Sequence, residues 1–269
     1  MTNGKRIFLT GFACFILVFC VHAQMPYSPK IICHRGHWNI AGSSQNSIAS
    51  LAKAQELRQK YGDVIYGVEF DVWITMDGTP VLSHDATIDS INIENSDYNL
   101  IKDKTLGNGE KIPTLAAYLE QGRKNPDVKL ICEIKTHSSR ENNDRAVEAV
   151  IQAVKDAGME AHVEYIAFDW QNCLCIHEKM PDTIAGYLNS DKTPQTLFDA
   201  GIMCMDYNMD TWKGNNDYAL QTRNLGIVSN VWTVNTSADI QYFIELGVDF
   251  LTTDDPELCC DELRQHSEN

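Results

Sequence analysis

Three carboxylates lie in two apolar stretches of the first half of the sequence. Glu69 and Asp71 stand two positions apart in residues 65–74, and Glu133 lies near the end of residues 128–134. Alternate residues of a strand share one face, so Glu69 and Asp71 project together. Neighbouring buried carboxylates repel one another and need a cation, a shared proton or a basic partner. Glu69, Asp71 and Glu133 therefore predict a site for one divalent cation.

Oxygen ligands alone favour a hard cation, Mg²⁺ or Ca²⁺, over zinc. His34 and His84 are then left for proton transfer near neutral pH, one as base and one as acid. Arg35 and Lys135 can supply the positive charge that an anionic substrate requires. These groups together suit phosphodiester cleavage.

Two structural alternatives stay open for the carboxylates. Glu69 and Asp71 could be salt-bridged residues of a barrel interior, and Glu133 could simply pair with Lys135, with which it shares a strand face.

The elements that must position these groups alternate regularly along the chain. Short apolar runs separated by amphipathic segments are typical of βα units around a parallel sheet. The expected strands are 30–34, 65–74, 128–134, 163–168, 183–188, 202–206, 227–234 and 249–253, and clear helical patterns span 47–60, 114–124, 143–157 and 237–246. Eight units predict an α/β fold, a TIM (β/α)₈ barrel, whose catalytic groups come from the C-terminal ends of the strands.

One stretch interrupts this regularity. Residues 86–112 have no clear period and are expected to form a short insertion after the second strand, on one face of the barrel. Residues 24–269 are otherwise expected to form a single domain of about the usual barrel length.

The first 23 residues have the outline of a secretory signal peptide. Lys5 and Arg6 precede an apolar run from residue 7 to residue 21, and Ala23 offers a small residue at the cleavage site. We expect an exported protein, periplasmic or secreted, with no stable membrane span after cleavage; an uncleaved anchor is the alternative. A net charge of −15 argues against a nucleic-acid partner.

Seven cysteines follow the signal segment. Cys33, Cys132 and Cys204 lie in strand-like runs, where buried thiols are expected. A disulfide among the remaining four, Cys173, Cys175, Cys259 and Cys260, stays open.

Motifs from one end of this domain to the other resemble those of the glycerophosphodiester phosphodiesterase family. They are His34-Arg35-Gly36, Glu69-x-Asp71-Val72, Thr75-x-Asp77-Gly78-x-Pro80-Val81, His84-Asp85, Pro113-Thr114-Leu115, Glu133-Ile134-Lys135, Val231-Trp232-Thr233-Val234-Asn235 and Gly247-Val248-Asp249 with Thr253-Asp254-x-Pro256. The ordered series is far more specific than any one motif.

The resemblance implies a metal-dependent barrel enzyme that hydrolyses glycerophosphodiesters, small molecules, to sn-glycerol 3-phosphate and an alcohol. It implies that the three carboxylates bind the cation and that His34 and His84 act as general base and acid. Arg35 and Lys135 would hold the phosphate, and Trp232 would line the alcohol or glycerol pocket, although a tryptophan in an apolar strand is also typical of a core. Two alternative functions are a related phosphodiesterase acting on lysophospholipid or phosphoinositol head groups, and a barrel that binds glycerophosphodiesters without turnover.

The sequence also departs from the family pattern. Gln45 stands where the family commonly has glutamate, and Ala167 where serine is frequent, which predicts an altered substrate preference. The acidic run Asp254, Asp255 and Glu257 is expected to be a solvated loop end outside the site. The remaining histidines of the domain, His37, His137, His162, His177 and His266, are expected on the surface or in loops.

Overall fold

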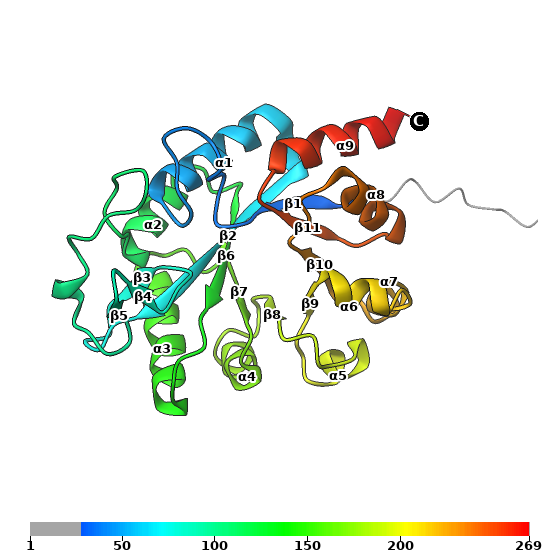
Figure 1. The fold of residues 1–269 in the computed structure, drawn as a ribbon. Helices are drawn as coiled ribbons and strands as arrows, with labels where there is room; N and C mark the ends of the chain where they lie inside the picture. Colours follow the sequence, from blue (N-terminus) through cyan, green and yellow to red (C-terminus); the bar gives the residue numbers. More distant parts are fainter. Residues whose placement is uncertain (1–27, 269) are drawn as a thin grey trace, which may run out of the picture.

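The computed structural model describes residues 28–268, so the predicted signal peptide lies outside the described residues. A barrel of eight parallel strands occupies the centre (Figure 1). In spatial order the strands are β1 (Lys30–Cys33), β11 (Phe250–Thr253), β10 (Val228–Trp232), β9 (Cys204–Asn208), β8 (Ala185–Tyr187), β7 (Val163–Ala167), β6 (Lys129–Ile134) and β2 (Ile65–Ile74). Pairing of β1 with β2 closes the barrel. The predicted fold is confirmed, and the predicted strand bounds differ from the observed ones by no more than two residues.

Helices surround the strands on the outside (Figure 1). They are α1 (Ile48–Tyr61), α2 (Leu115–Gly122), α3 (Arg140–Asp156), α4 (Trp170–Lys179), α5 (Pro194–Asp199), α6 (Met209–Gly214), α7 (Tyr218–Leu225), α8 (Ser237–Leu246) and α9 (Pro256–Glu268). Most begin after a side chain that accepts a hydrogen bond from the first turn, for example Ser47 before α1 and Thr236 before α8. Such caps satisfy backbone donors that a helix start leaves without partners.

The strands send alternate side chains to two different cores. On β2, Val68, Phe70 and Val72 belong to the large core between strands and helices. A smaller apolar cluster with Ile131 and Ile166 fills the barrel interior. Glu69 and Asp71 face inward, as the alternation predicts.

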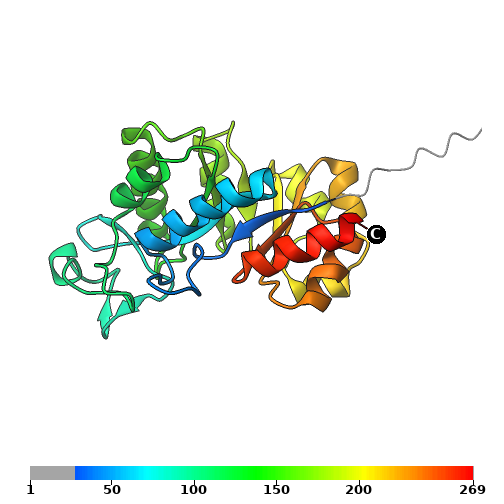
Figure 2. The ribbon, with the colours of Figure 1, turned by 90° about the horizontal axis from the view of Figure 1, so that it is seen from above.

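Residues 86–112 contain a hairpin of β4 (Thr87–Ile88) and β5 (Ile91–Asn92), followed by a 3₁₀ helix at Tyr98–Leu100. The segment packs its own apolar cluster, including Ile93 and Ile101, against Trp73 of β2 and against β3 (Pro80–Leu82). Figure 2 shows this segment beyond the end toward which β1 runs, the C-terminal end of the barrel strands.

Two of the histidines expected on the surface or in loops occupy loops and yet are buried. His37 and His137 lie in loops, but each is only 4% exposed. His137 accepts a hydrogen bond from the backbone N–H of Ile74 at Nε2, and its Nδ1 lies 2.8 Å from the carbonyl oxygen of Lys135. The imidazole therefore holds β2 next to the residue that follows β6.

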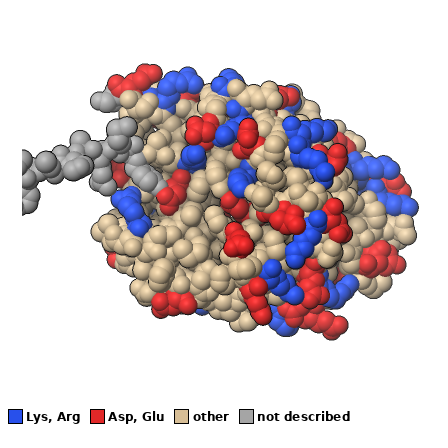
Figure 3. Space-filling model, turned by 180° about the vertical axis from the view of Figure 1, so that it is seen from behind, with Lys and Arg blue, Asp and Glu red and all other residues tan. Residues whose placement is uncertain are grey.

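All seven cysteines of the described part are free, and Cys33, Cys132 and Cys204 are buried, as predicted. Among residues 28–268 no helix has the length and apolar character needed to cross a membrane. On the face drawn in Figure 3, acidic and basic side chains are interspersed.

Candidate active site

A cavity of about 90 Å³ opens at the C-terminal ends of the barrel strands. Most of the predicted site residues line it, namely His34, Arg35, Glu69, His84, Glu133, Lys135 and Trp232. Asp71 lies just behind this lining and is 1% exposed. The structure therefore brings together every residue that the sequence singled out, while their roles stay predictions.

The three carboxylates form one compact cluster. One oxygen from each of Glu69, Asp71 and Glu133 lies within 4.8 Å of the others, and all three residues are buried. Glu69 Oε2 accepts a hydrogen bond from the backbone N–H of Arg35, but its Oε1 is buried without a hydrogen-bond partner. A buried carboxylate oxygen without a hydrogen-bond partner destabilises the folded protein, and a hard cation would supply the missing partner. The donor set thus fits Mg²⁺ or Ca²⁺.

Electrostatics within the cluster differ from residue to residue. Burial raises the pKa of Glu69, and the negative charge of Asp71 raises it further. Burial likewise raises the pKa of Glu133 to about 7, with Asp71 adding to the effect. Burial acts in the same direction on Asp71, but Lys135 and the hydrogen bond from Asn46 outweigh it, so the pKa of Asp71 is lowered. The cluster concentrates more negative charge than Lys135 neutralises, which favours a cation there.

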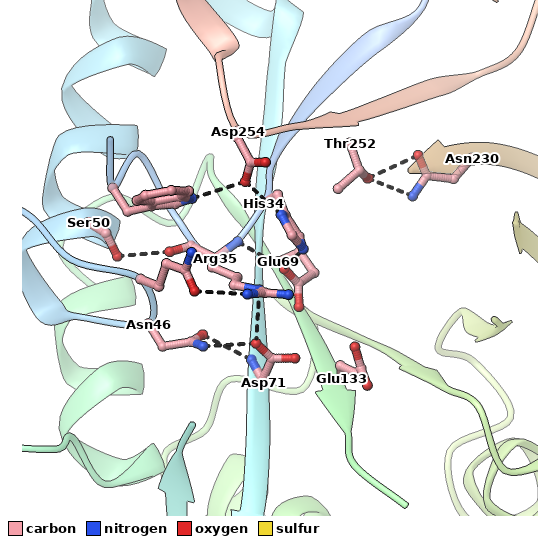
Figure 4. Close-up of polar contacts among 12 residues, drawn as sticks. His34, Arg35, Asn46, Ser50, Glu69, Asp71, Glu133, Asn230, Thr252 and Asp254 are labelled. Atoms are coloured by element: carbon pink, nitrogen blue, oxygen red, sulfur yellow. Dashed lines mark hydrogen bonds and ion pairs between the residues drawn. The ribbon is translucent and has the colours of Figure 1, made fainter. Parts of the chain in front are cut away.

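The loop after β1 wraps around this cluster. Arg35 and Gly36 both have positive φ, 54° and 84°, and a Cβ on Gly36 would lie 2.3 Å from Ser50 Oγ. Glycine alone fits this turn. The turn brings Asn46 to Asp71, where its amide donates to Oδ2 at 2.8 Å and accepts from the backbone N–H of Asp71 at 3.0 Å (Figure 4). Asn46 was not among the predicted site residues, although it directly follows Gln45, where the sequence departs from the family pattern.

His34 follows β1 directly, and Asp254 follows the neighbouring strand β11. His34 Nδ1 lies 2.8 Å from Asp254 Oδ1, and His34 Nε2 lies 3.9 Å from Glu69 Oε2 (Figure 4). The expectation that Asp254 is a solvated loop end is wrong: Trp38 and Asn235 also donate to its carboxylate. Although burial raises its pKa, the hydrogen bond from His34 lowers it below the usual value. The ionised carboxylate fixes Nδ1 as the protonated nitrogen and leaves Nε2 free on the cavity side.

His84 sits at the mouth of the cavity, with its side chain 43% exposed. Its Nδ1 lies 2.9 Å from Asp85 Oδ1, and its backbone carbonyl accepts from Trp73 Nε1 at 3.4 Å. The imidazole at the rim is therefore accessible to water.

Two cations border the cluster. Lys135 Nζ lies 2.7 Å from Glu133 Oε1 and 3.1 Å from Asp71 Oδ1. The open alternative of a Glu133–Lys135 pair is therefore real, but the pair lies inside the carboxylate cluster. Arg35 donates from one terminal nitrogen to Gln45 Oε1 at 2.8 Å. Gln45 thus keeps the hydrogen bond at a position where the family commonly has a charged glutamate.

Aromatic side chains form one wall of the cavity. Trp232 and Phe168 pack edge to face, with ring centroids 5.8 Å apart, and Trp232 Nε1 donates to the carbonyl oxygen of Asp206. The pocket position expected for Trp232 agrees with this arrangement. Ala167 instead points to the outer core, so the hydroxyl missing there would not reach the cavity.

Asp206, Asn230 and Thr252 form the floor of the cavity and were not predicted. Asp206 stands between outward-facing Met205 and Tyr207 of β9, so the alternation rule could have placed it inside.

The sequence profile of the glycerophosphoryl diester phosphodiesterase family matches residues 34–258. The chain belongs to this family. Family membership confirms the resemblance, and the enzyme class predicted from the sequence, a phosphoric diester hydrolase, is that of the family.

Relatives of the family cover nearly the whole described chain. A glycerophosphodiester phosphodiesterase of Caldanaerobacter subterraneus is 26% identical over 249 residues, covering 87% of this chain and 98% of the relative. A glycerophosphodiester phosphodiesterase structure from Parabacteroides distasonis is 36% identical, with a TM-score of 0.87 over 90% of this chain and 100% of that one. An Oleispira antarctica phosphodiesterase in complex with its product sn-glycerol-3-phosphate shares the fold, with a TM-score of 0.72, 19% identity, and coverage of 88% of this chain and 98% of that one.

Proposed function

We propose that the chain hydrolyses glycerophosphodiesters to sn-glycerol 3-phosphate and an alcohol, with His34 as general base and His84 as general acid. The observation that carries this proposal is the fixed His34 imidazole, whose Nε2 faces the same cavity as the carboxylate cluster. Family membership and the product bound in the Oleispira antarctica relative support the substrate class.

The carboxylate cluster would hold one divalent cation, Mg²⁺ or Ca²⁺. When bound, such an ion supplies positive charge that stabilises the phosphoryl oxygens as negative charge develops on them. Glu69, Asp71 and Glu133 are its proposed ligands.

The chain's own side chains account for the proton transfers. His34 Nε2 takes the proton of the attacking oxygen, and Asp254 stabilises the imidazolium that results. His84, exposed at the mouth, gives a proton to the alcohol oxygen that departs toward solvent. Arg35 and Lys135 are held in place by carboxylates and by Gln45, so their positive charges face the phosphate with little reorganisation.

We also propose that the protein is exported and acts in the periplasm or outside the cell. The basic residues Lys5 and Arg6, the apolar run behind them and Ala23 support a cleaved signal peptide. Mass spectrometry of the protein from extracytoplasmic fractions should find an N-terminus near residue 24; an intact Met1 there would contradict cleavage.

The activity is tested with residues 24–269, glycerophosphocholine and either Mg²⁺ or Ca²⁺. We expect release of sn-glycerol 3-phosphate, loss of activity with a chelator, and recovery when the cation is restored. His34→Ala and Glu69→Ala should each lower kcat/KM by at least about 10²-fold. His266→Ala is the matched control, because this histidine is exposed on α9.

Unchanged rates in His34→Ala and Glu69→Ala would overturn the site assignment. Binding of the diester without product, with the cation present, would favour a non-catalytic barrel. Turnover of lysophospholipid in preference to glycerophosphocholine would favour the related phosphodiesterase.

A further inference from the structure

Asp206 occupies an unusual place at the inner end of the cavity. It lies on β9, is 2% exposed, and lines the same cavity as His34 and Glu133. Its Oδ1 is buried without a hydrogen-bond partner. Native proteins rarely leave a buried carboxyl oxygen unpaired, so this atom calls for an explanation outside the fold.

The neighbouring strands show that the barrel does not require an acid at this depth. Ile131 of β6 and Ile166 of β7 fill the interior at the same cavity, as bulky aliphatic residues usually do in such barrels. An aliphatic side chain at position 206 would pack here without an unpaired oxygen. A carboxyl group at position 206 is therefore better suited to contact a bound ligand than to pack in an apolar core.

Asn230 and Thr252 complete the polar part of the floor. Asn230 Nδ2 donates to Thr252 Oγ1 at 2.9 Å, and Thr252 Oγ1 donates to Asn230 Oδ1 at 3.1 Å (Figure 4). Asn230 also hydrogen-bonds the carboxyl group of Asp206. Asn230 and Thr252 thus satisfy each other's hydrogen bonds and orient the carboxyl group of Asp206.

The dimensions and walls of the cavity restrict what can reach Oδ1. With a volume of about 90 Å³, the cavity leaves room beside Asp206 only for a small group. Part of the lining is apolar, with Ile131, Ile166 and Leu188, and suits a C–H surface. A quaternary ammonium group has no proton to donate, so it would leave Oδ1 unpaired, whereas a hydroxyl group would satisfy it.

We propose that Asp206, oriented by Asn230 and Thr252, forms a hydroxyl-binding subsite for the glycerol end of the substrate. Oδ1 of Asp206 accepts a hydrogen bond from the terminal glycerol hydroxyl, and this makes Asp206 a specificity-determining residue. The alcohol end, which varies among glycerophosphodiesters, extends past exposed His84 toward solvent. This inference rests on the proposed function.

The test compares two diesters in the presence of Mg²⁺. One is glycerophosphocholine; the other is its propane-1,2-diol analogue, in which hydrogen replaces only the terminal hydroxyl. We expect the wild type to prefer the glycerol diester by about 10²-fold in kcat/KM, because the analogue leaves Oδ1 unpaired. Asp206→Leu should reduce this preference to less than about threefold while turnover of the analogue remains.

Two further variants serve as controls for this test. Asp206→Asn keeps a side-chain oxygen and should keep part of the preference, which covers the case in which Asp206→Leu folds poorly. Glu164→Gln is the matched control: Glu164 also faces the barrel interior, but it is bonded to Tyr66 Oη at 2.5 Å and does not line the cavity. This variant should keep the wild-type preference.

Binding of sn-glycerol 3-phosphate and of propane-1,2-diol 1-phosphate, measured by calorimetry, should show the same loss of preference in Asp206→Leu. A wild type that hydrolyses both diesters equally would overturn the subsite and leave the proposed function standing. If Asp206→Leu kept the wild-type preference for the glycerol diester, this would also overturn the subsite and leave the proposed function standing. A wild type that hydrolyses neither diester would overturn both the subsite and the proposed function.

Discussion

At the scale of single residues, the two nitrogens of His34 have different surroundings. Nδ1 is bound by Asp254, whereas Nε2 faces Glu69 and the cavity. Asp254 itself is held by Trp38 and Asn235, so the carboxylate cannot turn away from the ring without breaking other hydrogen bonds. The orientation of the imidazole therefore depends on Asp254, a residue that does not line the cavity.

Asp254→Asn should lower kcat by on the order of 10²-fold with little change in KM, because the neutral amide no longer stabilises the imidazolium. Steady-state kinetics with glycerophosphocholine measure this. Asp255→Asn is the control: Asp255 accepts from the backbone N–H of Leu258 at the start of α9 and makes no contact with His34. Equal effects of the two substitutions would contradict a positioning role for Asp254.

Asp206 links the site to the pH dependence of stability. Burial raises its pKa to about 7, with Asn230 acting in the opposite direction, while the unfolded chain has a pKa of about 3.9. Below pH 4 both states are protonated. As pH rises from about 4 to about 7, only the unfolded state loses the proton, so the free energy of unfolding falls by roughly 1.4 kcal/mol per unit of the pKa difference.

Asp206→Asn should abolish this fall. In urea denaturation without added cation, the difference in unfolding free energy between the variant and the wild type should therefore widen in favour of the variant from pH 4.5 to pH 7.5. Parallel pH profiles for the two proteins would contradict the raised pKa.

At the scale of elements, α1 depends on a residue from the 86–112 segment. The first turn of α1 contains no acidic residue. Glu110 supplies one from outside, accepting hydrogen bonds from the backbone N–H groups of Ile48 at 3.0 Å and Ala49 at 3.1 Å. A carboxylate at a helix N-terminus satisfies free donors and interacts favourably with the helix dipole. The segment thus fixes the start of α1, two residues after Asn46, which binds Asp71.

Glu110→Ala should lower the free energy of unfolding by about 1 to 2 kcal/mol, because two backbone donors lose their partner. Urea denaturation checks this value. Glu120→Ala is a suitable control, since Glu120 forms only a long, exposed ion pair with Arg123. A loss no larger than that of the control would show that water replaces Glu110 without cost.

At the scale of the whole molecule, the barrel and half of the cavity lining followed from the sequence. Period-two alternation located β2 and its inward carboxylates, because that strand is long and continuous. Asp254 was missed because it stands in an acidic run, which is typical of solvated loops, and its partner His34 is 220 positions away. Local patterns do not encode such distant contacts. His137 lies in a loop, as expected, but its burial was not predicted, because its partners are backbone atoms of Ile74 and Lys135.

The closure of the barrel through β1 also affects the order in which the parts of the site become available during synthesis. β1 pairs with β2, which follows soon in the chain, and with β11, which is among the last parts to be synthesised. A growing chain can already contain Glu69, Asp71 and Glu133 while the carboxylate that clamps His34 has yet to be made. The carboxylate cluster thus belongs to the early half of biosynthesis, but an oriented His34 exists only in a chain that has passed residue 254.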